Sequence, residues 1–561
     1  MRLPYLRRTI ALLAATAAAA GFVAGCSGED QVPSIGYAVD TAVASYNGGT
    51  TAGAASAQAV FGRVLTGFFY TGPDGQPVAD GDTGTAKEVP GEAQTIQYRL
   101  NPQGTYSDGV PTSCDDLVFT WAARSGRFPR FDSASTAGYE DIERVECQPG
   151  SKDGTVVFRP GRRYLPWRTL FGAGELMPAH VAAQAANVPD IVTAVQNDDR
   201  AALDRLADFW NTGWDLAPGD LDITRFPSSG PYRIESFGLE DGLVLVANER
   251  WWGQAPATGR IVVYPKPADL AARIEDGSAS VVDIGAGSLP ETNLDAFSVQ
   301  NVPSRGIEQV VLNTGGVFES AAARRAFALC VPRQALYDQL GRSADAPEAG
   351  VGVGTSNSRT LQQDSPFYPA ATGASGPFAA GDVEGAKAAL ADAGKDGMVV
   401  RVGYLAPDAR RAQTISMIAD SCKAAGISVE DAGTPDFTPV RLREGAVDAV
   451  LGGPGGAPGP AGSLDGIAAI GGLRSGSGLN IGQFRNGRFD GITDQLAGED
   501  NSTNQLNLLT EAENLLWAQL PSVPLFATPR TIAFAGGLQN AIAGPTRAGS
   551  GWNMDRWVLQ R

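Results

Sequence analysis

Histidine and lysine are almost missing from this sequence of 561 residues. It holds one histidine, His180, and 6 lysines among its 44 basic residues. A single histidine excludes zinc sites built from several histidines and the H-E-x-x-H motif, and it leaves a histidine-dependent catalytic triad with one candidate. The setting of His180, Met-Pro-Ala-His, is typical of the start of a helix, so we expect a structural role for it.

The motifs of common enzymes are missing as well. There is no G-x-S-x-G nucleophile elbow, and Gly394-Lys395 is followed by Asp396 rather than by the Ser or Thr of a Walker A loop. The glycine-rich stretches at 350–354 and 452–462 lack the G-x-G-x-x-G register, and we interpret both as loops. We therefore expect a protein that is not an enzyme and has no cofactor and no metal site.

The charge balance is strongly acidic, although charged residues are scarce. Charged residues make up 19% of the chain, and the net charge is −17 at pH 7. A chain with this charge repels phosphate backbones, which argues against nucleic acid as a partner. Hydrophobic residues make up 43% of the chain, enough to bury sizeable cores.

The first 25 residues resemble a bacterial lipoprotein signal peptide. Three arginines precede an apolar run from Thr9 to Val23, which fits a signal-peptide core and is short for a bilayer that needs ~20 residues. The run ends in Val-Ala-Gly-Cys, which resembles a lipobox, and this implies that Cys26 is acylated and becomes the first residue after cleavage. Simple secretion is the alternative. We expect a lipid-anchored protein at the outer face of the cell membrane, with a polar tether at 26–34.

Four further cysteines support export: Cys114, Cys147, Cys330 and Cys422. None has C-x-x-C spacing, and an even number of cysteines in an exported protein is typical of disulfides. Three pairings are possible, and free buried thiols are the alternative.

Hydrophobic periodicity predicts both strands and helices. Residues 95–100 alternate as a half-buried strand does, and residues 261–264 are rich in β-branched side chains. Further along, short strands alternate with helices at 383–393, closed by Gly394, and at 411–425. Such alternation predicts an α/β fold.

Six segments stand out along the chain: P-D-G-Q-P-V at 73–78, Y-R-L to D-D-L-V-F-T-W at 98–121, G-P-Y to W-W-G at 230–253, L-N-T to R-R-A-F at 312–327, G-A-K to A-G at 385–394, and P-S-V-P-L at 521–525. In this order they resemble the extracytoplasmic solute-binding proteins of family 5, the dipeptide-, oligopeptide- and nickel-binding components of ABC importers. Together these segments cover nearly the whole chain after the signal peptide.

The resemblance implies a two-lobed clamshell of the type II periplasmic binding proteins, with an extra subdomain. The implied units are lobe I at 35–65, 225–305 and 530–561, the extra subdomain at 66–224, and lobe II at 306–529. The pairings Cys114–Cys147 and Cys330–Cys422 are favoured because each pair then falls within one unit.

The resemblance also implies a function. The protein would enclose a peptide or peptide-like solute between its lobes and deliver it to an ABC permease and ATPase complex, and we expect it to act as a monomer. The residues that would contact the ligand are Tyr46, Asn47, Asn313, Thr314, Gly453, Gly455 and Asn480.

One segment departs from the family pattern. Peptide-binding members usually carry an acidic residue in a late W-x-x-D-Y-x-D-P-like segment, which pairs with the ligand's α-ammonium group. The corresponding stretch here, 452–460, is rich in glycine and proline and has neither an acid nor an aromatic residue. A buried ammonium group without a partner is costly. A second hypothesis is therefore a lipoprotein of the same fold that regulates cell-envelope glycolipid synthesis through protein contacts.

Overall fold

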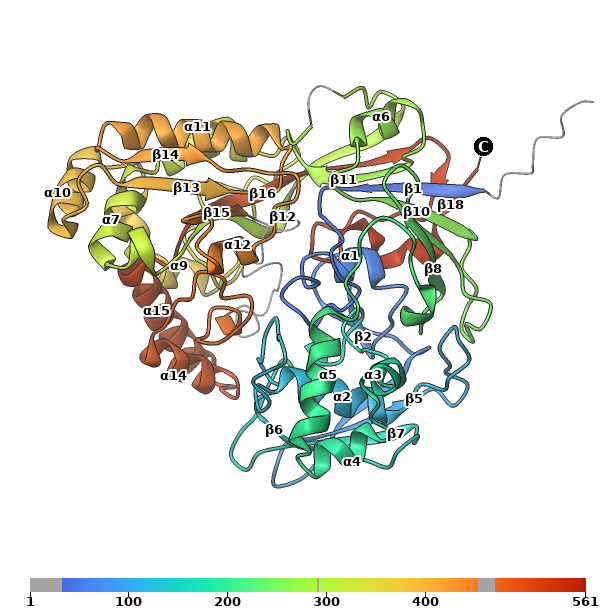
Figure 1. The fold of residues 1–561 in the computed structure, drawn as a ribbon. Helices are drawn as coiled ribbons and strands as arrows, with labels where there is room; N and C mark the ends of the chain where they lie inside the picture. Colours follow the sequence, from blue (N-terminus) through green and yellow to red (C-terminus); the bar gives the residue numbers. More distant parts are fainter. Residues whose placement is uncertain (1–32, 290–291, 453–469, 561) are drawn as a thin grey trace, which may run out of the picture.

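One mixed sheet of ten strands extends across both lobes of the molecule (Figure 1). The computed structural model describes residues 33–289, 292–452 and 470–560. In spatial order the strands are β14 (Ser428–Asp431), β13 (Val399–Gly403), β15 (Ala449–Gly452), β12 (Phe297–Leu312), β16 (Ser522–Ala535), β11 (Val281–Gly285), β1 (Ser34–Val39), β10 (Arg260–Tyr264), β9 (Gly242–Ala247) and β8 (Tyr232–Gly238).

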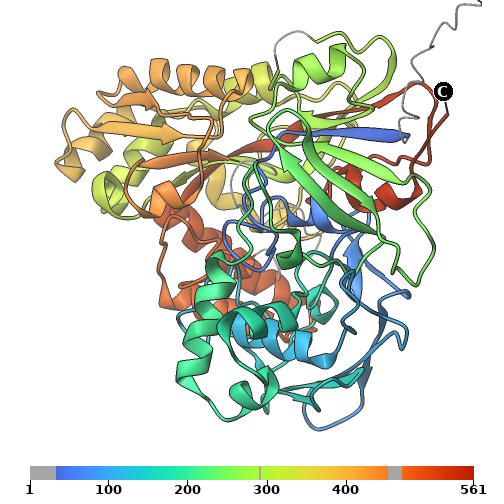
Figure 2. The same ribbon diagram turned by 45° about the vertical axis from the view of Figure 1, so that its right-hand side comes forward.

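Two long antiparallel strands, β12 and β16, connect two lobes. Arg530 to Phe534 of β16 pair with β11 in the first lobe, whereas Gln309 to Leu312 of β12 pair with β15 in the second lobe. The pairing of β12 with β16 is irregular between Pro303 and Ile307, and again between Glu308 and Gln309. The pairing thus changes register along the stretch where β12 and β16 connect the lobes. Figures 1 and 2 show the sheet passing from one lobe to the other.

Helices α7 (Ala321–Cys330), α10 (Val383–Ala393) and α11 (Ala409–Lys423) pack around the second lobe's end of the sheet (Figure 1). The α10 helix has the predicted bounds, since Asp382 caps its start and Gly394 ends it in a left-handed conformation with φ of 61°. The α11 helix begins two residues before the predicted Arg411, because the side chain of Asp408 accepts the Arg411 N–H.

A separate four-stranded sheet lies below the first lobe in Figure 1. Its strands, in spatial order, are β4 (Gly84–Val89), β5 (Thr95–Leu100), β7 (Asp153–Phe158) and β6 (Ile142–Cys147). Helices α2 (Cys114–Arg124), α3 (Ala179–Ala186), α4 (Ile191–Gln196) and α5 (Arg200–Thr212) belong to the same region. His180 lies in the first turn of α3, where its Nε2 is 2.8 Å from Oδ2 of Asp108.

The cysteines form the two favoured disulfides. Cys114 of α2 bonds to Cys147 of β6, and Cys330 of α7 bonds to Cys422 of α11. Each disulfide therefore fastens a helix to a neighbouring element of the same region.

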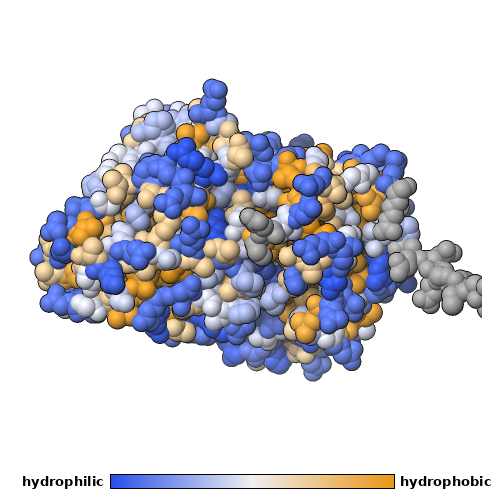
Figure 3. All heavy atoms as spheres, turned by 90° about the horizontal axis from the view of Figure 1, so that it is seen from above, coloured by the Kyte–Doolittle hydropathy of each residue, from blue (hydrophilic) through white to orange (hydrophobic). Residues whose placement is uncertain are grey.

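Polar and apolar side chains are interspersed on the face that Figure 3 shows from above. The large hydrophobic side chains that are exposed, such as Ile223, Leu239 and Ile542, are far apart in sequence and occur singly, as is normal for a protein surface. Within the described ranges, no helix has both the length and the apolar character needed to cross a bilayer.

Candidate ligand-binding site

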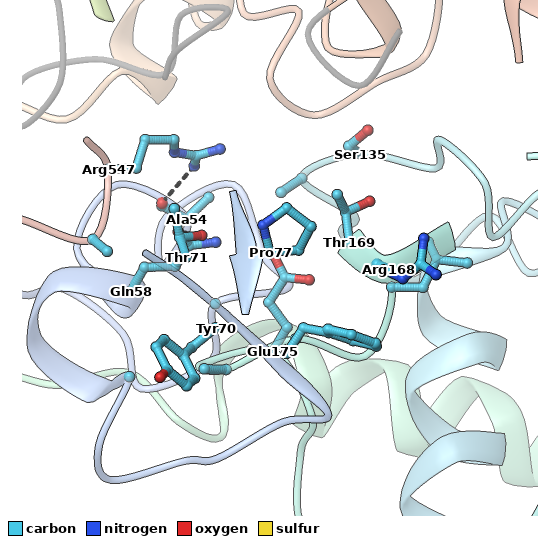
Figure 4. A pocket seen from close by; sticks show the side chains of 18 of the residues that line it. Ala54, Gln58, Tyr70, Thr71, Pro77, Ser135, Arg168, Thr169, Glu175 and Arg547 are labelled. Atoms are coloured by element: carbon cyan, nitrogen blue, oxygen red, sulfur yellow. Dashed lines mark hydrogen bonds between the residues drawn. The ribbon is translucent and has the colours of Figure 1, made fainter. Parts of the chain in front are cut away.

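A cavity of about 180 Å³ lies where the two lobes and the four-stranded region meet (Figure 4). Four parts of the chain line it: residues 48–77 around α1 (Ala57–Phe61), β2 (Phe69–Thr71) and β3 (Pro77–Ala79), residues 124–175, Gly472 with Leu479, and residues 547–552. No two of these parts are continuous in sequence, so the cavity exists only in the assembled fold.

A buried ion pair forms part of the wall. Arg124, the last residue of α2, pairs with the carboxylate of Glu175, donates to the Ser135 carbonyl oxygen at 3.2 Å and lies 4.5 Å above the Tyr139 ring. Burial alone would lower the pKa of Arg124, but the Glu175 carboxylate outweighs it and raises that pKa. Arg124 therefore keeps its positive charge beside the Glu175 carboxylate.

Arg547 is a second cation in the wall. Its Nη2 donates to the Ala54 carbonyl oxygen at 2.8 Å (Figure 4), and among the described residues its guanidinium forms no ion pair. Burial lowers the pKa of Arg547; Glu175 partly offsets this effect, and the nearby Arg124 adds to it. This half-buried cation thus lacks a carboxylate of its own among the described residues.

The rest of the wall offers aromatic and neutral polar groups. The rings of Tyr70 and Trp552 stack with their centroids 6.2 Å apart, and Thr71 donates to Oε1 of Gln58 at 3.2 Å. A wall of this kind suits a small solute with both apolar and polar parts.

Contacts between the four-stranded region and the second lobe close the site on one side. The backbone N–H groups of Gly478 and Leu479 donate to the carbonyl oxygens of Ser133 and Ala134 at 3.0 and 2.8 Å. Arg474 pairs with Glu140 on the other side of the same junction. The structure is thus in an arrangement in which the second lobe touches the four-stranded region beside the cavity.

An ion-pair network, fully buried, lies between the lobes at the change of register in β12. Glu308 accepts from Arg410 at 3.2 Å and from Arg411 at 3.1 Å, both in the first turn of α11. Asp408, just before α11, lies 3.4 Å from Lys266, which follows β10 of the first lobe. Charges from both lobes are therefore compensated here, in direct contact across the junction.

The structure places the side chains of Tyr46 and Asn47 in the core and not in the wall of the cavity. The Tyr46 hydroxyl donates to the Pro227 carbonyl oxygen at 2.9 Å, and the Asn47 amide donates to the Trp210 carbonyl oxygen at 3.1 Å. Both residues are fully buried. Their neighbour Gly48 does line the cavity, and a side chain there would collide with the Gly174 carbonyl oxygen.

The structure brings Thr314 and Asn480 to one loop of the second lobe. Thr314 donates to the Gly482 carbonyl oxygen at 2.9 Å, and Asn480 holds the same loop through Phe484. Asn480 also lines a second cavity of about 20 Å³, next to the first. Asn313 faces Leu442, with its amide 2.9 Å from the carbonyl oxygen of that residue.

Three predicted positions, Cys26, Gly453 and Gly455, lie outside the described residues. Contact of any predicted residue with a ligand therefore stays a prediction.

Sequence reasoning missed Arg124, Glu175 and Arg547. The capping residues Ser113 and Asp116 mark only the start of α2, and Arg547 stands in a Thr-Arg-Ala segment with no periodic or motif context. No local pattern indicates that it meets residues near position 54.

One group of side chains among the described residues has the spacing of a metal site: Cys114, Asp115 and Cys147. Its two sulfur atoms are bonded to each other, so they do not act as thiolate ligands.

The fold is that of the type II periplasmic binding proteins. Oligopeptide-binding protein AppA of Bacillus subtilis, solved with a nonapeptide, superimposes with a TM-score of 0.73 at 14% identity, over 94% of this chain and 99% of AppA. The chain belongs to the bacterial extracellular solute-binding proteins, family 5, whose middle region matches residues 83–466.

Two mycobacterial proteins illustrate its sequence relatives. A protein of Mycobacterium tuberculosis H37Rv, named an uncharacterized lipoprotein, is 42% identical over 98% of this chain and 97% of its own length. The oligopeptide-binding protein OppA of the same strain is 26% identical over 87% of this chain and 78% of its own length.

Proposed function

We propose that the protein is the lipid-anchored substrate-binding component of an ABC importer, which captures peptides or peptide-like solutes between its lobes and delivers them to a permease. The observation that carries this proposal is the cavity at the junction of the lobes, lined from four separate parts of the chain. Membership of family 5 and the likeness to OppA support a solute-binding role and a peptide-like ligand.

Ligand capture would couple to movement of the lobes. The change of register between β12 and β16 is the natural place for a hinge, because a few residues at the ends of regular pairing absorb the change in backbone angles. A ligand in the cavity then adds contacts to both lobes and stabilises the arrangement in which they touch.

Native mass spectrometry of the protein, purified without refolding, tests the proposal. We expect a discrete small molecule of peptide-like mass to accompany the wild-type protein. The variant Thr169→Trp, which places an indole at the exposed edge of the cavity, should carry less of it, whereas Thr503→Trp on the distant helix α15 (Ser502–Gln519) should carry as much as the wild type.

An empty wild-type protein whose melting temperature does not change with peptides would contradict a transport role. Ligand at 100 times its dissociation constant should stabilise the fold by about 2.7 kcal/mol, a change that is easily measured. That result would favour the regulatory lipoprotein, which needs protein contacts and no enclosed solute.

The anchor has its own test. With Cys26→Ala we expect loss of labelling by an alkyne fatty acid and release of the protein from the membrane fraction. Cys26→Ser, which also lacks the sulfur, serves as the matched variant. Continued labelling of either variant would contradict acylation at Cys26.

A further inference from the structure

The charges around the cavity do not balance among the described residues. Three arginines, Arg124, Arg168 and Arg547, line it together with a single carboxylate, Glu175. Figure 4 shows Arg168, Arg547 and Glu175. Arg124 and Glu175 neutralise each other in their buried pair. Arg168 is exposed and lies 4.5 Å above the Trp167 ring. Arg547 therefore remains as the inward cation that has no carboxylate among the described residues.

Among the described residues, Arg547 makes one side-chain hydrogen bond, so further donors face the cavity. Within those ranges only its Nη2 donates, to the Ala54 carbonyl oxygen at 2.8 Å. A guanidinium carries five N–H donors in a planar fork, which matches the two oxygens of a carboxylate. Burial lowers the pKa of Arg547, which shows that the surroundings already remove part of its hydration. An anion in the cavity would replace the hydrogen bonds to water that the guanidinium of Arg547 loses on burial.

The cavity wall and the rest of the protein carry net charges of opposite sign. The whole chain carries a net charge of −17, so its surface field repels anions in general. Arg168 and Arg547 line this concave site without an ion pair among the described residues, which is a local exception in such a chain. The stacked rings of Tyr70 and Trp552 line the same cavity, so an anionic group bound there would lie next to an aromatic wall.

We propose that this cavity selects solutes that carry a carboxylate, and that Arg547 binds that carboxylate as the specificity-determining residue. The inference rests on the proposed solute-binding function and deepens it. The described walls fit the acidic end of a peptide-like solute, since their one carboxylate, Glu175, is already paired. An α-ammonium group finds no spare acid in them.

Matched acid and amide probes test the inference. N-acetyl-trialanine and its C-terminal amide differ only in the carboxylate, as do succinate and succinamide. Isothermal titration at constant ionic strength should show that the wild-type protein binds each acid about 10- to 100-fold more tightly than its amide. In Arg547→Gln this preference should vanish through weaker binding of the acids, with amide binding unchanged.

Two further variants keep the test interpretable. Arg205→Gln removes one positive charge on α5, outside the cavity, and should retain the full acid preference. Arg547→Lys keeps the charge but loses the planar fork, and should retain only part of the preference. Melting temperatures show whether each variant is folded; the comparison of acid with amide in the wild-type protein needs no variant.

The outcomes separate the two levels of the proposal. Equal binding of acids and amides, or an equal loss of both in Arg547→Gln, overturns the carboxylate inference and leaves the solute-binding function standing. If the wild-type protein binds none of the four probes, the carboxylate inference fails. The proposed function fails only if native mass spectrometry also finds no co-purified ligand.

Discussion

The buried carboxylate of Glu308 gives the sharpest prediction about what holds the lobes together. Its side chain is 0% exposed and accepts from Arg410 at 3.2 Å and from Arg411 at 3.1 Å. Glu308→Gln conserves the shape of the side chain and removes its charge. Two buried guanidinium groups would then have lost their shared counter-charge.

The expected loss is about 3–5 kcal/mol of the free energy of unfolding, the range found when one partner of a buried ion pair is removed. The pKa of Glu308 also determines in which direction the stability of the protein changes with pH. Although burial raises it, the pKa of Glu308 lies below its ordinary value of 4.5, because Arg410 and Arg411 outweigh the burial. The stabilisation is therefore complete above pH 4.5 and is lost as the pH falls further.

Urea denaturation, followed by tryptophan fluorescence and circular dichroism at pH 7 and pH 4, measures both effects. Glu308→Gln should be much less stable than the wild type at pH 7, and the difference should shrink at pH 4. The exposed pair of Glu511 with Arg488 provides the control, and Glu511→Gln should change little. A loss below about 1 kcal/mol, or a difference that does not depend on pH, would refute the reasoning.

Three other predictions concern separate parts of the fold. Burial raises the pKa of Asp116 to about 6 from its ordinary 3.8, so stability should fall by up to about 3 kcal/mol as the pH rises through 6, and Asp116→Asn should abolish this slope in melting curves. The Cys330–Cys422 disulfide spans 92 residues, so Cys422→Ser should cost about 4–5 kcal/mol in urea denaturation, and a cost near zero would contradict the loop-entropy argument. Arg474 of the second lobe pairs with Glu140 of the four-stranded region, so Arg474→Gln should let these two parts separate and increase the radius of gyration measured by X-ray scattering; an unchanged value would show that this junction does not hold them together.

Local elements of the fold could be predicted because their causes are local. The α10 helix ends at Gly394 as expected, since a left-handed residue is easiest for glycine. Residues 95–100 form β5 because their alternation matches one buried face. The helix α11 begins at Ala409, two residues before the predicted Arg411, because Asp408 caps it and hydrophobic periodicity does not reveal that cap.

The candidate site was beyond such reasoning because its walls come from distant parts of the chain. Arg547 and Ala54 are in contact although 493 residues separate them. Asn47 lies in a polar, glycine-rich stretch that is typical of a loop, but its amide donates to the Trp210 carbonyl oxygen in the core. Local patterns report which face of an element is buried, and they contain no information on which loops converge.

The first lobe joins strands from the beginning and the end of the sequence, and this affects when it can fold. Strand β1 begins at Ser34, its neighbour β11 pairs with β16, and the Tyr37 ring packs 5.3 Å from the Trp557 ring near the other end of the chain. The first lobe therefore cannot complete its fold until β16 and the residues around Trp557 have been synthesised. Contacts so distant in sequence form slowly. A shortened chain that ends before β16 should therefore remain unfolded in its first lobe.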